Sequence, residues 1–171
     1  ADPDILKARA LEFGFQAVGI CNASEPLSYA YYQSWIEAGF SGDMAYLRDS
    51  AELRSSIDNV LPGARSALVV ALNYNQYPTR PRTEGRIARY ALGRDYHKVV
   101  RSKLKRLANK ELPDAAWRIC VDSAPILERE FAQRAGLGWY GKNTCLIDSA
   151  RGSWFVIGLL LTTEELVPST P

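Results

Sequence analysis

The 171-residue sequence has few of the side chains that build metal centres or covalent frameworks. It contains three cysteines and one histidine, and Cys21, Cys120 and Cys145 lie far apart with no C-x-x-C spacing. An odd, scattered set of cysteines argues against a disulfide framework and against a four-cysteine metal or cluster site within the chain. The single histidine, His97, excludes a zinc site with several histidines. Cys120 and Cys145 lie in apolar stretches, so we expect buried and unreactive thiols.

Long apolar runs are also missing. The longest, residues 154–161, has eight residues and contains a glycine, whereas a helix that spans a bilayer needs about 20. The N-terminal Ala-Asp-Pro-Asp has neither the basic nor the apolar region of a signal peptide. We therefore expect one cytoplasmic domain without a membrane partner, since 47% hydrophobic and 23% charged residues are typical of globular chains.

The net charge of +2 conceals an uneven distribution of charge. Residues 80–118 contain 12 Lys and Arg against 4 Asp and Glu, a local balance of +8, so the rest of the chain is acidic at −6. A concentrated basic segment is typical of proteins that bind a polyanion. The composition thus favours a nucleic acid or a phosphorylated ligand as partner.

Hydrophobic periodicity predicts helices and strands that alternate without regular βαβ units. The main elements expected are a buried central strand over 67–72, a short strand over 87–92, a helix capped by Asp95 and running to about residue 110, a helix capped by Ser123 and ended by Gly136, and a hairpin that pairs 144–147 with 153–163. This pattern predicts an α+β (mixed α/β) fold with a partly antiparallel central sheet flanked by helices.

The first motif is Gly-Leu-Gly-Trp-Tyr-Gly-Lys-Asn-Thr at residues 136–144. It matches G-x-x-x-x-G-K, but Asn143 stands where a phosphate loop needs a hydroxyl, and a predicted helix precedes it instead of a strand. A nucleotide phosphate loop is therefore disfavoured. Two interpretations remain: a helix end followed by a tight turn, or a close approach of backbone to a flat ligand, with Lys142 reaching the polar edge of that ligand.

The second motif is Val-Asp-Ser-Ala-Pro at residues 121–125. Asp122 stands at the end of a predicted strand and before a helix, where ligands bind in open sheets. It either stabilises the helix start or acts as a proton donor, and the second role requires burial that raises its pKa. Arg129 is either an anchor for an anionic or carbonyl group or an ordinary surface arginine.

The third motif, residues 88–98, interleaves two tyrosines with two arginines, one lysine and His97. Such a mixture is typical of segments that stack on bases and contact phosphates. The alternative is the start of a helix with a solvated basic face, in which His97 is a hydrogen-bonded structural residue.

In their order and spacing, three segments closely resemble the N-terminal domain of the epoxyqueuosine reductase family. They are Arg-Tyr-Ala-Leu-Gly-Arg-Asp-Tyr-His at 89–97, Val-Asp-Ser-Ala-Pro-Ile-Leu-Glu-Arg-Glu at 121–130, and Ala-Gly-Leu-Gly-Trp-Tyr-Gly-Lys-Asn-Thr at 135–144, followed by Gly-Ser-Trp-Phe at 152–155. The resemblance covers essentially the whole chain.

This resemblance implies an oxidoreductase of queuosine biosynthesis. Its members reduce epoxyqueuosine to queuosine at the wobble position of tRNAs with a GUN anticodon, using cobalamin and two 4Fe-4S clusters. The cobalamin domain is similar to the B12-processing and nitroreductase-like sandwiches. The cysteine runs that bind the clusters are absent here, so we expect residues 1–166 to form the cobalamin-binding catalytic domain and 167–171 to begin a linker to a ferredoxin-like domain.

The resemblance also implies roles for individual residues. Asp122 matches the proton donor and Arg129 a residue of the substrate site. The residues expected to border the corrinoid are Arg89, Tyr90, Tyr96, His97, Lys142 and Asn143. The expected partners are tRNA and a reductase or ferredoxin-like electron donor, the expected state is a monomer, and turnover by this chain alone is not expected. The alternative function is a non-catalytic corrinoid-binding or RNA-binding module.

Overall fold

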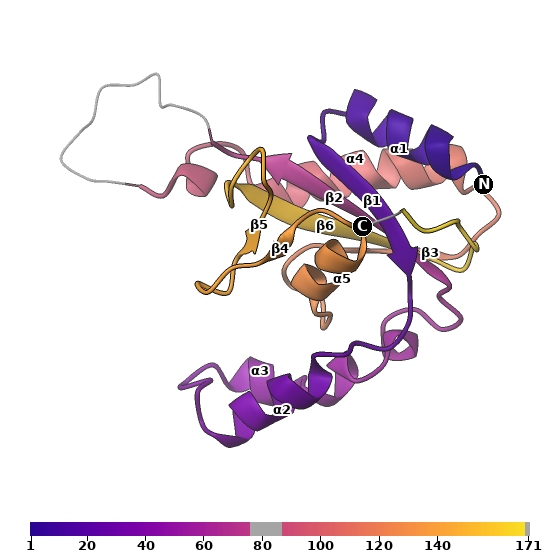
Figure 1. Cartoon of the computed structure of the whole chain (residues 1–171). Helices are drawn as coiled ribbons and strands as arrows, with labels where there is room; N and C mark the ends of the chain where they lie inside the picture. Colours follow the sequence, from indigo (N-terminus) through magenta and orange to yellow (C-terminus); the bar gives the residue numbers. More distant parts are fainter. Residues whose placement is uncertain (76–86, 170–171) are drawn as a thin grey trace.

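A four-stranded sheet forms the centre of the protein (Figure 1), whose computed structural model describes residues 1–75 and 87–169. Across the sheet the strands are β1 (Ala17–Asn22), β2 (Ser66–Asn73), β6 (Phe155–Thr162) and β3 (Trp117–Cys120). Every strand pair in the described residues of this sheet is antiparallel. The predicted α+β class is confirmed, and the apolar run at 67–72 is a central strand, between β1 and β6.

Two layers cover the two faces of the sheet. Successive β2 side chains alternate between them, because Leu68 and Val70 pack with one buried cluster while Val69 and Ala71 pack with the other. The first layer consists of α1 (Pro3–Glu12) and α4 (Tyr96–Glu111). The second consists of α5 (Glu128–Arg134) and the hairpin of β4 (Trp139–Tyr140) and β5 (Leu146–Ile147). The continuous apolar run of β2 thus reflects burial on both faces.

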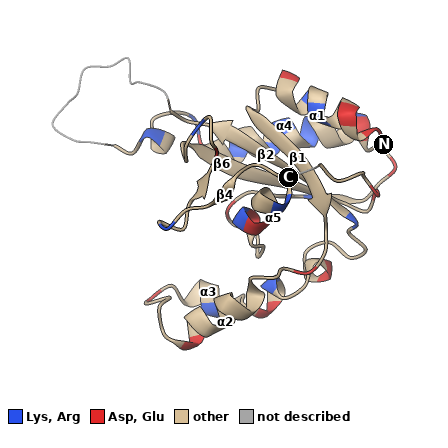
Figure 2. Cartoon of the chain, viewed as in Figure 1, with Lys and Arg blue, Asp and Glu red and all other residues tan. Residues whose placement is uncertain are grey.

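Helix α4 begins at the predicted cap. The Asp95 side chain accepts a hydrogen bond from the His97 backbone N–H at 2.9 Å. Val100, Leu104 and Leu107 are buried against the sheet, and a residue larger than Gly158 on β6 would meet Val100 at 2.5 Å. Most of the basic residues of α4 are exposed. Figure 2 marks them in blue along the helix. Of the basic segment, Arg80, Arg82 and Arg86 lie outside the described residues.

An arm between β1 and β2 extends away from the sheet (Figure 1). It consists of α2 (Tyr29–Glu37), α3 (Ala45–Asp49) and the 3-10 turns η1 (Glu52–Arg54) and η2 (Ile57–Asn59). All residues of the two fully described helices α2 and α3 remain at least partly exposed. The helices of the arm therefore project from the sheet, whereas Ile57 in η2 is buried in the core.

Among the described residues, no helix has the combination of length and apolar character that crossing a bilayer requires.

Two local predictions were wrong. Residues 144–147 do not pair with 153–163, because β2 and β3 occupy both edges of β6 and β5 pairs with β4 instead. Between β5 and β6, Asp148 closes a tight turn by accepting hydrogen bonds from the N–H groups of Ala150 and Arg151, both at 2.8 Å. Residues 87–92 do not form a strand either, since they contain the 3-10 turn η3 (Arg89–Ala91).

The start of the helix after β3 was also predicted wrongly. Helix α5 begins at Glu128, and Ser123 lies in an irregular stretch before it. The Ser123 hydroxyl accepts a hydrogen bond from Arg101 Nη2 at 2.9 Å instead of capping the helix. The positive φ of Asp122, 58°, turns the chain sharply and prevents a helix from starting there. Gly136 follows the helix with a φ of 78°, as predicted.

Candidate functional site

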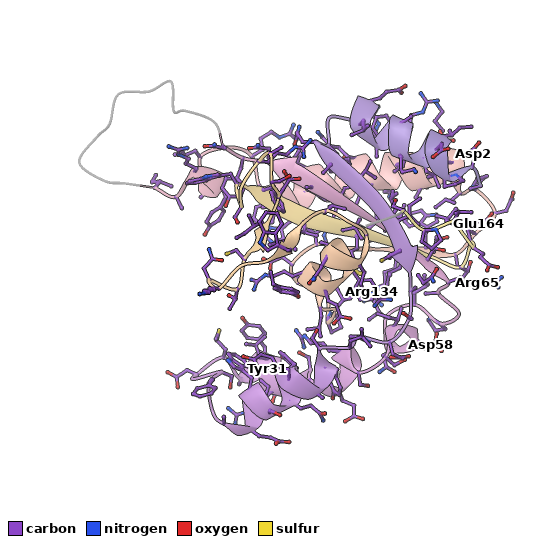
Figure 3. All side chains as sticks on the ribbon, in the orientation of Figure 1. Asp2, Tyr31, Asp58, Arg65, Arg134 and Glu164 are labelled. Atoms are coloured by element: carbon purple, nitrogen blue, oxygen red, sulfur yellow. The ribbon has the colours of Figure 1, made fainter. Side chains whose placement is uncertain are left out.

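A cavity of about 780 Å³ lies between the arm, residues 122–129 and the β4–β5 hairpin. Figure 3 labels Tyr31 on the arm and Arg134 on helix α5 on the other side. Aromatic and aliphatic side chains form most of the wall, among them Tyr31, Tyr32, Trp35, Tyr46, Leu47, Ile126 and Leu127. The charged lining residues are Arg54, Asp122, Glu128 and Arg129. A largely apolar wall with a few charged groups is typical of small-molecule and cofactor sites, which measure about 300–1,000 Å³.

Asp122 stands on the rim of this cavity with a side chain that is 67% exposed, so the burial expected of a proton donor is not provided by the described residues. Its carboxylate oxygen Oδ2 accepts a hydrogen bond from the Tyr96 hydroxyl at 2.8 Å and lies 3.3 Å from His97 Nε2. A left-handed backbone conformation is uncommon outside glycine and concentrates at functional sites. Two residues at the start of α4 thus hold the Asp122 carboxylate in one orientation.

His97 links two carboxylates. Its Nδ1 lies 2.9 Å from Asp95 Oδ1 and its Nε2 faces Asp122. The hydrogen bond with His97 lowers the pKa of Asp95, so Asp95 accepts and Nδ1 carries its hydrogen. His97 therefore connects the carboxylates of Asp95 and Asp122 through its two ring nitrogens.

Tyr96 contributes as a hydrogen-bond donor. Burial and the hydrogen bond to Asp122 both raise the pKa of its hydroxyl above the ordinary value of 10.0. The phenol therefore keeps its hydrogen and continues to donate to Asp122 across the physiological pH range.

Glu128 is the second carboxyl of the cavity, and it lies in a different environment. Burial, with a smaller contribution from the charge of Asp122, raises the pKa of Glu128 from an ordinary 4.5 to about 8. A hydrogen bond from the backbone and the charges of Arg54 and Arg129 lower this pKa but do not compensate for burial. The Oε1 atom is sealed from solvent and has no hydrogen-bond partner among residues 1–75 and 87–169, although the residue as a whole is half-buried. Glu128 thus places a largely neutral carboxyl with one unpaired oxygen in the cavity wall.

Glu130, two residues further along α5, is fully engaged. Its carboxylate accepts hydrogen bonds from the backbone N–H of Leu27 at 2.8 Å and of Ser28 at 3.0 Å, and also from the Ser28 hydroxyl. Arg134 lies 3.5 Å from Glu130 and donates to the carbonyl of Asn22 at 2.8 Å. These contacts fix the chain that leads into α2, so they set the position of the aromatic wall.

Arg129 lines the cavity and also supports the hairpin. Its guanidinium donates to the carbonyl of Thr144 at 2.9 Å, and Thr144 itself has a φ of 63°. A side chain on Gly138 would meet the carbonyl oxygen of Ile147 at 2.2 Å, and one on Gly141 would meet Ile147 Cδ1 at 2.5 Å. The glycines of the first motif are thus required by packing within the hairpin. The phosphate-loop interpretation is wrong because this segment is a helix end followed by that hairpin.

The other predicted residues lie around this cavity or outside it. Lys142 and Asn143 are exposed in the turn of the hairpin, where Asn143 Oδ1 accepts from the N–H of Cys145 at 3.2 Å. Tyr90 packs edge-to-face on Tyr96. Arg89 stacks 4.8 Å from the ring centre of Trp154. The structure therefore brings Asp122, Arg129, Tyr96 and His97 together and places the other four at the periphery.

The sequence analysis missed the aromatic wall and Glu128. Tyr31, Tyr32 and Trp35 follow helical i, i+1, i+4 spacing on one side of α2, and that spacing is an available signal. The sequence analysis identified no site in this segment, whereas the structure shows that these side chains line a cavity. Glu128 lies inside the motif that contains Asp122, but a sequence gives no indication that a carboxyl is buried without a partner.

Comparisons with known proteins identify related sequences. The family described as "Epoxyqueuosine reductase QueG, DUF1730" matches residues 54–123. The epoxyqueuosine reductase of Synechococcus sp. (strain RCC307) is 43% identical over 179 residues, a match that covers 98% of this chain and 54% of the relative. The epoxyqueuosine reductase of Gloeobacter violaceus is 44% identical over 172 residues, a match that covers 97% of this chain and 53% of that relative. The chain thus spans about half the length of the curated relatives it matches.

Solved structures show the same similarity. The epoxyqueuosine reductase from Streptococcus thermophilus has a TM-score of 0.85 at 28% identity, covering 97% of this chain and 47% of that one. An epoxyqueuosine reductase with an epoxyqueuosine-modified tRNA-Tyr stem loop has a TM-score of 0.82 at 27% identity, covering 98% and 47%. A reductive dehalogenase with a TM-score of 0.61 at 21% identity, covering 97% and 20%, shares the fold. The predicted sandwich architecture is confirmed.

Proposed function

Because the chain belongs to the epoxyqueuosine reductase family, we propose that it is the part of such an enzyme that holds cobalamin and protonates the substrate. The observation that carries this proposal is the Asp122 carboxyl on the cavity rim, held by Tyr96 and paired with His97. Opening an epoxide breaks one of the two C–O bonds of its oxygen. The oxygen stays on the other carbon and needs a proton. Asp122 supplies that proton, and His97 replaces it.

Tyr96 and the left-handed backbone orient Asp122, and Asp95 keeps His97 in the tautomer whose Nε2 faces Asp122. Arg129 contributes positive charge on the cavity wall for the oxygen that becomes negative as the ring opens. The apolar wall limits the access of water to that oxygen. Each of these actions belongs to residues of this chain.

The residues of the cavity fit one side of a large, flat cofactor. Tyr31, Tyr32, Trp35 and Tyr46 place aromatic side chains in the cavity wall, which supports the packing of a flat ring system there. We propose that the peripheral residues Arg89, Tyr90, Lys142 and Asn143 contact the edge of the cofactor. Cobalamin, when bound, supplies the electrons that reduce the epoxide.

Three further assignments complete the proposal. Residues 1–166 form the cobalamin domain and 167–171 begin a linker, of which 170–171 lie outside the described residues. We propose that the complete protein carries the two 4Fe-4S clusters and receives electrons from a reductase or ferredoxin-like donor outside this chain, which covers 54% of the Synechococcus relative. A monomer located in the cytoplasm is proposed, as suits an enzyme acting on tRNA.

The tRNA partner is supported by the related enzyme whose structure contains a modified tRNA-Tyr stem loop. The exposed basic side chains of α4 lie next to the site, since Arg101 contacts Ser123, the neighbour of Asp122. We propose that these side chains contact tRNA phosphates. The affinity of the chain for tRNA should therefore fall steeply as the salt concentration rises.

Two measurements test the proposed function. Cob(II)alamin added to the purified chain should change its visible absorbance and EPR spectrum, and unchanged spectra would contradict the cofactor assignment. In the complete reductase, Asp122→Asn should lower turnover of epoxyqueuosine tRNA by about 10²–10⁴-fold while cobalamin still binds. Retained turnover would eliminate Asp122 as proton donor. If the chain binds cobalamin but the complete protein does not turn over epoxyqueuosine tRNA, the result would favour the alternative function, a non-catalytic corrinoid-binding module.

A further inference from the structure

A second, shallow groove of about 510 Å³ lies at the edge of the sheet, apart from the cavity that contains Asp122. Strand β3 forms one side of the groove and is the outer strand of the sheet, with β6 as its neighbour. Helix α4 forms the other side. The lining residues are Arg101, Ser102 and Lys105 of α4 and Trp117, Arg118 and Ile119 of β3. The groove therefore runs between a basic helix and an open sheet edge.

The basic side chains of α4 differ in what they contact. Lys103 lies 5.4 Å from the ring centre of Phe15, so its charge is used in packing near the end of α1. Arg101 and Lys105 line the groove instead. Within the described residues, neither of these two side chains is paired with a carboxylate. The groove thus carries positive charge that the fold does not neutralise.

Trp117 and Ile119 give the groove an apolar floor. Both are half-buried and pack against the buried cluster that α4 shares with the sheet. The carbonyl of Ala116 accepts a hydrogen bond from the residue that follows β6, so the alternating pattern directs the backbone groups of Trp117 and Ile119 away from β6. Arg118 donates to the carbonyl of Val60 at 2.7 Å, which fixes its guanidinium. The floor therefore combines an aromatic side chain with free backbone groups.

One end of the groove lies beside the proposed proton donor. Arg101 Nη2 donates to the Ser123 hydroxyl at 2.9 Å, and Ser123 directly follows Asp122. Lys105 lies two turns beyond His97, about 12 Å along the axis of α4. Stacked nucleotides advance about 3.4 Å each, so this distance corresponds to about three or four nucleotides. A strand whose reacting base is at Asp122 would therefore bring a phosphate of a nearby nucleotide to Lys105.

We propose that this groove binds the phosphodiester backbone of the tRNA anticodon stem loop on one side of the reacting nucleotide. Arg101 and Lys105 contact neighbouring phosphates, and Trp117 provides an apolar surface for a sugar or base. Charge favours RNA over a protein strand, because a strand added to a sheet edge pairs through backbone groups and requires no cations. This inference rests on the proposed function and deepens it, since it narrows the phosphate contacts of α4 to its groove side.

The contact is tested by the affinity of the complete reductase for a fluorescently labelled anticodon stem loop, measured by anisotropy at several salt concentrations. Lys105→Gln should weaken binding about three- to tenfold at low salt. It should also reduce the slope of log affinity against log salt concentration by about 0.7–0.9, as expected for one lost phosphate contact. Lys103→Gln is the matched control, because it removes the same charge from the same helix. Its affinity should stay within about twofold of wild type, with an unchanged slope.

Stem loops in which a single phosphate is replaced by a neutral methylphosphonate test the position of the contact. One replacement, about three or four nucleotides from the wobble position, should weaken binding by wild type. The same replacement should leave the affinity of Lys105→Gln unchanged, because that variant has already lost the contact. If every replacement weakened wild type and Lys105→Gln equally, the assigned contact would be refuted.

The outcomes separate this inference from the proposed function. Equal losses of affinity in Lys105→Gln and Lys103→Gln would show that net charge alone attracts the RNA, and would overturn the inference. Unchanged affinity in both Lys105→Gln and Arg101→Gln would also overturn it, and would leave a protein strand as the occupant of the β3 edge. Either result leaves the proposed function intact if wild type reduces epoxyqueuosine tRNA. Absence of turnover by wild type would instead contradict the proposed function, whatever the groove binds.

Discussion

The two sides of helix α5 show how one short segment carries two carboxyls in different environments. On the packed side, Glu130 is buried at 6% exposure and accepts hydrogen bonds from the chain leading into α2. On the cavity side, Glu128 is half-buried, and its Oε1 is unpaired within the described residues. Satisfied polar groups stabilise a fold, whereas unsatisfied buried ones lower its stability. The hydrogen-bond partners of a carboxyl, and not its place on the helix, therefore decide what it contributes to stability.

The largest expected effect on stability comes from the packed side. Glu130→Ala removes the acceptor for two backbone N–H groups and leaves Arg134 without its carboxylate, so the free energy of unfolding should fall by about 3 kcal/mol. Urea denaturation at pH 7 measures this change. Glu128→Ala is the matched control and should change the stability by less than about 1 kcal/mol. Equal losses in the two variants would remove the proposed difference between the two sides.

The pH dependence of stability should come from the cavity side. The pKa of Glu128 is about 8 in the folded chain and 4.5 ordinarily, so the unfolded chain releases this proton at lower pH than the folded one. Unfolding therefore becomes easier as the pH rises from about 5 to 8, and the contribution of Glu128 should fall by on the order of 2 kcal/mol.

Urea denaturation of wild type and Glu128→Gln from pH 5 to pH 9 tests this linkage. The difference between their free energies of unfolding should change steadily up to about pH 8 and then become constant. A difference that stayed constant from pH 5 to pH 8 would show that Glu128 ionises as readily in the folded chain as in the unfolded one.

Tyr96→Phe should have a moderate effect, and on function alone. It removes the donor to Asp122 Oδ2, so Asp122 is held less firmly and turnover of the complete reductase should fall about tenfold. The thermal midpoint should stay within about 2 °C of wild type, because the lost hydrogen bond is exposed. Measuring turnover of both enzymes under the same conditions tests the role of Tyr96. Unchanged turnover would argue against it.

The smallest effect is expected far from both sides of α5. Arg65 and Glu165 form an ion pair of 2.7 Å with side chains that are 59% and 71% exposed. Glu165→Gln should change the free energy of unfolding by less than about 0.5 kcal/mol, since exposed ion pairs contribute little. Urea denaturation at low and high salt measures it. A loss of unfolding free energy comparable with that of Glu130→Ala would contradict this comparison. It would mean that the size of the loss does not depend on whether the hydrogen bonds are buried.

Local patterns predicted much of the fold. The apolar run of β2 and the Asp95 cap of α4 were identified correctly, because burial on two faces and helix capping leave direct signatures in residue order. The strand pairing after residue 144 was not predicted, because pairing depends on which sheet edges are already occupied. The start of α5 was missed for a similar reason, since the backbone conformation of Asp122 is stabilised by contacts with α4.

The sequence by itself determined the α+β class, the family resemblance and the identity of Asp122 and Arg129 as candidate site residues. Only the tertiary structure decided that Tyr96 and His97 converge on Asp122, that the aromatic arm forms a cavity wall, and that Glu128 and Glu130 differ. The physical reason is that helix and strand formation depends on neighbours a few residues apart. The hydration and pairing of a carboxyl depend on groups brought together from distant parts of the chain.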